Sequence, residues 1–134
     1  MGAHTPTGRQ RGASLSAFSA VVMVALFLVT GLVVDGGQKA AAQRESEAAA
    51  AQAARIGVDA GAVAAVQGRP SGAVAVAAAR ASLRSQGVAG RVSLLPGGVL
   101  HVRVERSVPT VFLSLIGVGS LSADAEAAAQ LHEG

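Results

Sequence analysis

Hydrophobic residues form one continuous stretch near the N-terminus. Between Arg11 and Asp35 no residue is charged, and positions 21–29 hold only apolar side chains. A helix rises about 1.5 Å per residue, so a segment over 13–34 reaches about 33 Å, which matches the hydrocarbon core of a bilayer. The pattern predicts a single transmembrane helix over 13–34.

The charges on either side of this span predict its orientation. Arg9 and Arg11 precede it, whereas Asp35 follows it directly, with Lys39 one helical turn further on at a spacing that allows an ion pair. By the positive-inside rule, 1–12 is a cytoplasmic basic tail and everything after Asp35 is extracytoplasmic. We therefore expect a single-pass protein of the cell membrane.

The alanine-rich stretch 38–66 is expected to continue the helix beyond the membrane. Helix formers dominate it and it contains no proline, which predicts a helical stalk over 35–67. Gly36 and Gly37 weaken a helix and predict a bend or hinge at the membrane surface. The alanines are either solvated or form a face that packs closely against other helices. We favour the packing face, because an alanine stalk alone would bury almost nothing.

The segment 71–134 is expected to form a small α/β head. The glycines and proline of 68–72 break the long helix, and Ser71 is suited to cap a second helix that ends near Gln86, before Gly87. The expected inner face of this second helix is marked by Val76, Ala79 and Leu83.

Alternation of apolar and polar residues then predicts strands. Val92 and Leu94 alternate with polar neighbours, and after a turn at 96–98 the alternation continues through 100–108. This predicts a β-hairpin with one apolar face. The stretch 120–131 has the composition of a helix but a period of two, so we expect a strand that pairs with the hairpin, with a helix as the alternative.

The most hydrophobic stretch outside the span is 111–116, between Pro109 and Gly117. It is too short to cross a membrane. We expect it to be the main plug of the head core, and contact with the bilayer surface or with a partner is the alternative. The predicted fold class is thus an α+β membrane protein. It has one transmembrane helix extended into a long alanine-rich helix, then a head with one helix and a short antiparallel sheet.

Composition and charge narrow the possible functions. The chain has no Cys, Trp or Tyr, and its apolar excess is alanine and valine, which bury little area per residue. No disulfide or thiolate metal site can support such a thin core. The net charge of +3 is small and forms no basic cluster, which argues against nucleic-acid binding.

The sequence contains no pattern typical of catalytic, cofactor-binding or metal-binding residues. His4, His101 and His132 fall in the tail, on the polar face of a strand and at the C-terminus, which favours surface histidines over a metal site. Glu45 and Glu47 lie two residues apart on a helix and point in different directions, which favours solvation over acid–base chemistry. Phosphate loops and nucleophile elbows are missing from the sequence. We expect a non-enzymatic chain with no cofactor and no small-molecule substrate.

Several pieces of the sequence, in this order, carry a family resemblance. The principal motif residues are Arg11 and Gly12 before the apolar helix, and Val34, Asp35, Gly36 and Gly37 after it. An alanine-rich helix with the sequence Ala53-Ala54-Arg55 follows, and 108–113 and 117–121 complete the series. The arrangement resembles the TadE/TadG-like pilus-assembly proteins of the tight-adherence system, of the actinobacterial type, over most of 11–131.

The resemblance implies a minor pilin or assembly factor that packs laterally with other pilin-like or pilus-assembly membrane proteins. It also implies prepilin-type processing between Gly12 and Ala13. One departure is clear: the TadE-type prepilins have a glutamate five residues after the cleaved glycine, where this chain has Ala17. A membrane-buried glutamate is costly unless a neighbouring subunit pairs with it, so its loss removes a register device and favours an accessory role over that of a major pilin.

Two alternatives belong to other functional classes. The small residues ending at Ala42 resemble a signal-peptidase site, so the chain could be a secreted or surface binding module released there. A weaker alternative is a membrane-bound enzyme subunit in which Phe112 and Ile116 line a pocket for a lipid acceptor. No convergent polar residues in the sequence support that idea.

Overall fold

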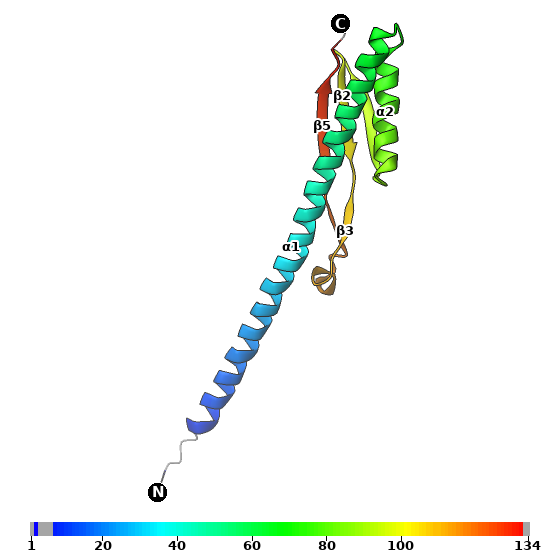
Figure 1. Cartoon of the computed structure of the whole chain (residues 1–134). Helices are drawn as coiled ribbons and strands as arrows, with labels where there is room; N and C mark the ends of the chain where they lie inside the picture. Colours follow the sequence, from blue (N-terminus) through cyan, green and yellow to red (C-terminus); the bar gives the residue numbers. More distant parts are fainter. Residues whose placement is uncertain (1, 3–6, 133–134) are drawn as a thin grey trace.

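A single long helix, α1 (Thr7–Val66), runs along most of the molecule, as the computed structural model shows (Figure 1). The structure describes residues 2 and 7–132, with the side chains of 11–132. The predicted continuation of the apolar helix into the alanine-rich stretch is confirmed. The helix remains intact through Gly36 and Gly37, where we expected a bend or hinge, so neither glycine interrupts its hydrogen bonding.

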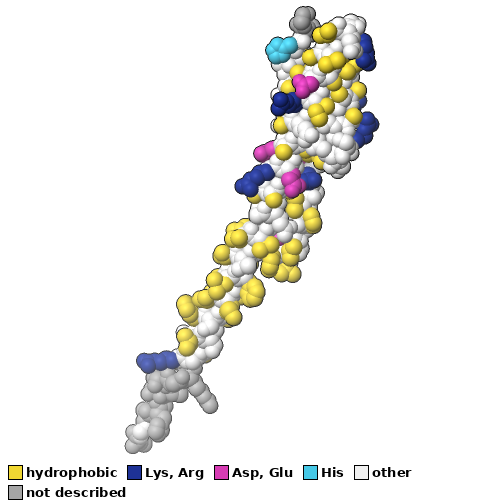
Figure 2. Space-filling model, viewed as in Figure 1, with side chains coloured by type: hydrophobic (Ala, Val, Ile, Leu, Met, Phe, Trp, Pro, Cys, Tyr) yellow, Lys and Arg dark blue, Asp and Glu magenta, His cyan; other side chains and the backbone are white. Residues whose placement is uncertain are grey.

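The N-terminal half of α1 carries apolar side chains on all its faces. Phe18 and Phe27 are each 67% exposed, and Figure 2 shows hydrophobic side chains along this part of the helix, with most charged side chains beyond it. Within the described residues, one helix is long and apolar enough to cross a membrane, and it lies near the N-terminus. This surface is compatible with a single membrane anchor.

The C-terminal half of α1 packs into the head beside α2 (Ser71–Ser85). The two helices cover one face of an antiparallel sheet with the order β1-β2-β5, formed by β1 (Gly90–Leu95), β2 (Val99–Val104) and β5 (Ala125–Gln130). The predicted hairpin is confirmed, with Gly97 and Gly98 at positive φ in its turn. The strand predicted near the C-terminus is also confirmed, because β5 pairs with β2.

The core lies between the sheet and the alanine faces of the two helices. Leu100, Val102 and Val104 of β2 are fully buried, as are Ala53 of α1 and Ala79 of α2. The alanines of α1 therefore form a packing face against the head of the same chain. Small residues on both helices let their backbones approach closely, which compensates for the small area that each alanine buries.

The ends and inner face of α2 agree only in part with the sequence pattern. The expected inner face is confirmed, with Ala79 and Leu83 buried and Val76 partly buried. The expectation that Ser71 caps the helix is wrong, because Pro70 occupies the cap position and no side chain caps it. Gly87, at a φ of 66°, ends the helix as predicted.

A second, two-stranded sheet extends from the head along α1. It comprises β3 (Ser107–Pro109) and β4 (Ser120–Ser122), and a 3-10 turn, η1 (Leu113–Ile116), lies between them. We call 107–122 the arm and 110–119 its tip. In Figure 1 the arm runs beside α1 toward the apolar half of the helix. The expectation that 111–116 plugs the core is wrong: η1 has no buried residue, and β2 fills the core instead.

Candidate functional site

The carboxylate of Asp35 holds the tip against α1. Asp35 is 2% exposed and accepts hydrogen bonds from three consecutive backbone N–H groups. Its oxygens lie 2.9 Å from the nitrogen of Val111, 3.1 Å from that of Phe112 and 2.7 Å from that of Leu113. Val111 and Phe112 precede η1 and Leu113 begins it, so no earlier residue of that helical turn can accept their hydrogen bonds. Asp35 thus supplies from a distant helix the acceptor that a capping residue usually provides.

The environment of Asp35 affects its acidity in two opposing ways. Burial disfavours the charged form, but the hydrogen bonds from Val111, Leu113 and Phe112 favour it, and together they hold the pKa of Asp35 below its ordinary value of 3.8. Asp35 is therefore ionised at neutral pH. Among the described side chains, no ion pair joins it to Lys39, the pairing that the helical spacing allowed.

Acidification is expected to loosen the tip. Because the pKa of Asp35 is lower in the folded state, its contribution to holding the tip is complete above pH 3.8 and is lost as the pH falls through the lowered value. The backbone amide chemical shifts of Val111, Phe112 and Leu113 should therefore titrate together, with a midpoint below 3.8, in nuclear magnetic resonance spectra of the protein in micelles. Asp35→Asn should remove this titration, and a midpoint above 3.8 would contradict the assignment.

An apolar contact reinforces the carboxylate at the tip. A Cβ atom on Gly31 would lie 2.6 Å from the Cβ of Phe112, so the phenylalanine approaches the backbone of α1 at a position where a larger residue would collide. The tip and α1 enclose a groove of about 290 Å³. The groove is lined by Phe27, Leu28, Gly31, Leu32, Phe112, Leu113, Leu115 and Ile116. This lining is wholly apolar.

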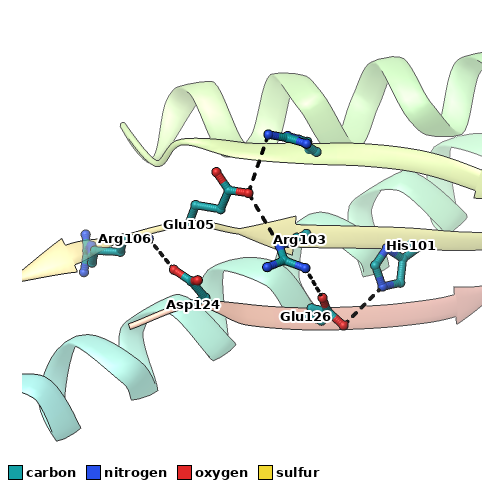
Figure 3. Close-up of polar contacts among 7 residues, drawn as sticks. His101, Arg103, Glu105, Arg106, Asp124 and Glu126 are labelled. Atoms are coloured by element: carbon teal, nitrogen blue, oxygen red, sulfur yellow. Dashed lines mark hydrogen bonds and ion pairs between the residues drawn. The ribbon is translucent and has the colours of Figure 1, made fainter. Parts of the chain in front are cut away.

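Polar contacts fix the base of the arm to α1. Arg106 forms an ion pair of 2.5 Å with Glu45, and Gln43 donates to the backbone oxygen of Asp124 at 2.6 Å. The carboxylate of Asp124 in turn accepts from the backbone nitrogen of Arg106 at 3.2 Å (Figure 3). The arm is therefore attached to α1 at two levels, by these contacts at its base and by Asp35 at its tip.

The outer face of the sheet carries a row of alternating charges. Arg103 contacts Glu126 at 2.9 Å and Glu105 at 3.5 Å, and His101 lies 3.6 Å from Glu126 (Figure 3). Arg103, Glu105 and Glu126 are about half exposed and His101 is 29% exposed, and such partly solvated pairs contribute at most about 1 kcal/mol each. Their arrangement stabilises the pairing of β2 with β5 and leaves the outer face solvated.

The structure separates the other residues singled out in the sequence. Gly12 and Ala13 are exposed on α1, and Gly36 and Gly37 face open space. Val34 is exposed at the end of the apolar stretch. Of the motif residues, only Asp35 forms a site.

The histidines and glutamates likewise converge on no common centre. Glu45 contacts the base of the arm, whereas Glu47 accepts only from Gln43 of its own helix. His4 lies outside the described residues, and among the residues that the structure describes no group of three His, Asp or Glu residues is placed to hold a metal ion.

The partners of Asp35 were missed because they are backbone amides more than 75 residues away along the chain. Two sequence features could have indicated this contact: the carboxylate directly after the span and the uncharged stretch over 107–123. Comparison with protein-family models, with curated proteins and with solved structures gives no match to this chain.

Proposed function

We propose that this chain is a non-enzymatic, membrane-anchored minor pilin or pilus-assembly protein of the TadE/TadG type. The observation that carries the proposal is the continuity of α1, which joins an exposed apolar half to a half that forms the spine of the head. The N-terminus is cytoplasmic and the head extracytoplasmic, because Arg9 and Arg11 precede the span and Asp35 follows it.

The unbroken helix favours an assembly role over that of a tethered binding module. A flexible linker would let the head move independently of its anchor, whereas a continuous helix transmits the position of the span to the head. Lateral packing of the apolar half against spans of similar proteins would therefore set the position of the head. In the bilayer such packing depends on close contact between side chains and not on water exclusion.

Cleavage near Ala42, which the secreted alternative requires, has less support. Such a cut would fall inside α1 and would remove Gly31 and Asp35, which both contact the tip. A head released in this way would lose the attachment of its tip.

Mass spectrometry of the mature N-terminus separates these cases. A start at Met1 or Gly2 indicates a retained anchor, and a start at Ala13 indicates prepilin-type processing. Either result is consistent with the proposal. A start near Gln43 would refute it in favour of secretion.

Cysteine cross-linking tests the proposed lateral packing. The chain has no cysteine, so single cysteines introduced one at a time over 13–34 are unique reporters. In membranes of a host that carries tight-adherence genes, we expect cross-links to other membrane proteins at positions repeating every three to four residues, because one face of a helix makes the contact. The same variants in a host without those genes are the control. A chain that stays monomeric and without cross-links at every position would contradict the proposal.

A further inference from the structure

The tip of the arm exposes apolar side chains that the head does not need. Leu115 is 83% exposed and Ile116 66% exposed, and the whole stretch 107–123 carries no charged residue. Figure 2 shows hydrophobic side chains at the end of the arm, beside those of α1. Adjoining exposed apolar side chains of this kind mark a surface that meets a membrane or another protein.

The position of the tip along α1 determines what it meets. The groove beneath the tip includes Phe27, Leu28 and Leu32, which belong to the span over 13–34. With a rise of about 1.5 Å per residue, positions 28 to 32 lie about 7 to 13 Å from the middle of that span. The hydrocarbon core extends about 15 Å on each side of its midplane. A tip that packs at this level is therefore inside the apolar layer whenever the span is.

We propose that the tip is a second membrane contact, which enters the outer leaflet beside α1. Lipid acyl chains then occupy the groove between the tip and α1. The inference rests on the proposed insertion of α1. It adds a lipid-contacting segment that lies about 80 residues after the span in the sequence.

The backbone of the tip is suited to an apolar solvent. Non-helical backbone at membrane depth requires its polar groups to be bonded within the protein. Asp35 accepts from three N–H groups of the tip, and the N–H groups of Leu115, Gly117 and Val118 bond to carbonyls inside it. The hydroxyls of Thr110 and Ser114 also donate to carbonyls of the tip.

Lipid fits this surface better than a second protein does. Protein interfaces combine an apolar centre with a polar rim and direct hydrogen bonds. Around Leu115 and Ile116 the tip offers no charged side chain, and its hydroxyls are already bonded within it. The apolar surface is also continuous with that of the span through Phe27 and Phe112. Two contacts instead of one would fix the height of the head and its rotation about α1.

Depth-dependent fluorescence quenching tests the inference on the full chain in nanodiscs. Leu115→Cys and, as a second variant, Ile116→Cys are labelled with an environment-sensitive fluorophore, and both positions are exposed, so labelling leaves the fold intact. Val24→Cys reports the middle of the span and Ser93→Cys the exposed surface of the head. We expect blue-shifted emission at 115 and 116. Quenching there should be stronger with nitroxides placed near the lipid headgroup than near the chain end, and the opposite is expected at position 24.

Each other outcome overturns the inference. Emission at 115 and 116 like that at Ser93, with position 24 in lipid, means that α1 spans the membrane and the tip stays in water. Water-like emission at all four positions means that the anchor itself fails. A blue shift at 115 and 116 that lipid nitroxides do not quench means that protein, such as a second copy, covers the tip.

Discussion

Replacing Asp35 by alanine is expected to detach the tip from α1 while leaving the head folded. The substitution leaves three backbone N–H groups without their acceptor, and the hydroxyls of Thr110 and Ser114 in the tip are already bonded to backbone carbonyls. Hydrogen bonds to a charged group are stronger than neutral ones, and an unpaired buried donor is costly. We expect hydrogen exchange of the Val111, Phe112 and Leu113 amides to become roughly tenfold faster or more, measured by nuclear magnetic resonance in micelles.

The same helix provides a matched control for this experiment. Asp59 is an exposed carboxylate of α1, and Asp59→Ala should leave exchange at the tip unchanged. Amides of β2, such as that of Val102, should keep their protection in both variants, because the core does not include the tip. Equal exchange at the tip in Asp35→Ala and in the unsubstituted protein would show that Phe112 and Gly31 alone hold the tip.

Asp35→Asn tests whether one acceptor oxygen is enough to hold the tip. Asp35→Asn keeps one oxygen that can accept, but it replaces the other with an NH₂ group that can only donate. Its effect on exchange should therefore lie between those of the unsubstituted protein and of Asp35→Ala. An asparagine variant that exchanges as slowly as the unsubstituted protein would mean that one acceptor suffices.

The sequence predicted the elements whose patterns are local. An uncharged run long enough to cross a bilayer predicts a long helix, and alternation around 96–98 predicts a hairpin, because both depend on neighbouring residues. The strand over 125–130 was also predictable, since its period of two outweighs the helical propensity of alanine once β2 offers a partner.

The wrong prediction for 111–116 shows what a local hydrophobic pattern cannot predict. The apolar character of 111–116 measures its tendency to leave water but not which apolar surroundings it will reach. Leu100, Val102 and Val104 already fill the space between the helices and the sheet. With the core occupied, the segment extends along α1, and its polar backbone groups require Asp35. The sequence does not show either the position of the segment along α1 or its bonding to Asp35, because both depend on how the arm aligns with the helix in three dimensions.

The glycines of α1 also show that the local sequence does not identify the residues on which packing depends. Gly36 and Gly37 were expected to produce a bend or hinge, yet they face open space and the helix continues through them. The glycines of α1 that the packing requires are Gly31 beneath the tip, and Gly57 and Gly61 where α2 crosses α1. Nothing in the sequence distinguishes them, because their importance depends on how the tip and the two helices align in three dimensions.

Gly57→Ala is expected to destabilise the head even though alanine favours helices. A Cβ at this position would lie 2.8 Å from the backbone oxygen of Ala75 and 3.1 Å from the Cβ of Ala79, so the two helices must separate. Overpacking of this kind typically costs about 1 to 3 kcal/mol, against a gain in helix propensity of about 1 kcal/mol. Gly57→Leu adds atoms that the crossing cannot hold and should lower the free energy of unfolding by about 3 kcal/mol or more. The core of the head consists largely of alanine. The expected loss is a large share of the free energy of unfolding of a folded domain, which is about 5 to 15 kcal/mol.

Thermal unfolding followed by circular dichroism in micelles measures these effects, with Gly36→Ala as the control. The control makes the same chemical change in the same helix, but apart from the adjacent backbone of α1 itself no atom lies within 4 Å of the new Cβ. It should therefore leave the unfolding temperature unchanged or raise it, by the gain of up to about 1 kcal/mol in helix propensity. Gly57→Leu should lower the unfolding temperature by at least roughly 10 °C, and Gly57→Ala by less. If both alanine variants raised the temperature equally, the close crossing of α1 and α2 at Gly57 would not limit the stability of the head, and the packing of its alanine faces would have to tolerate an added methyl group.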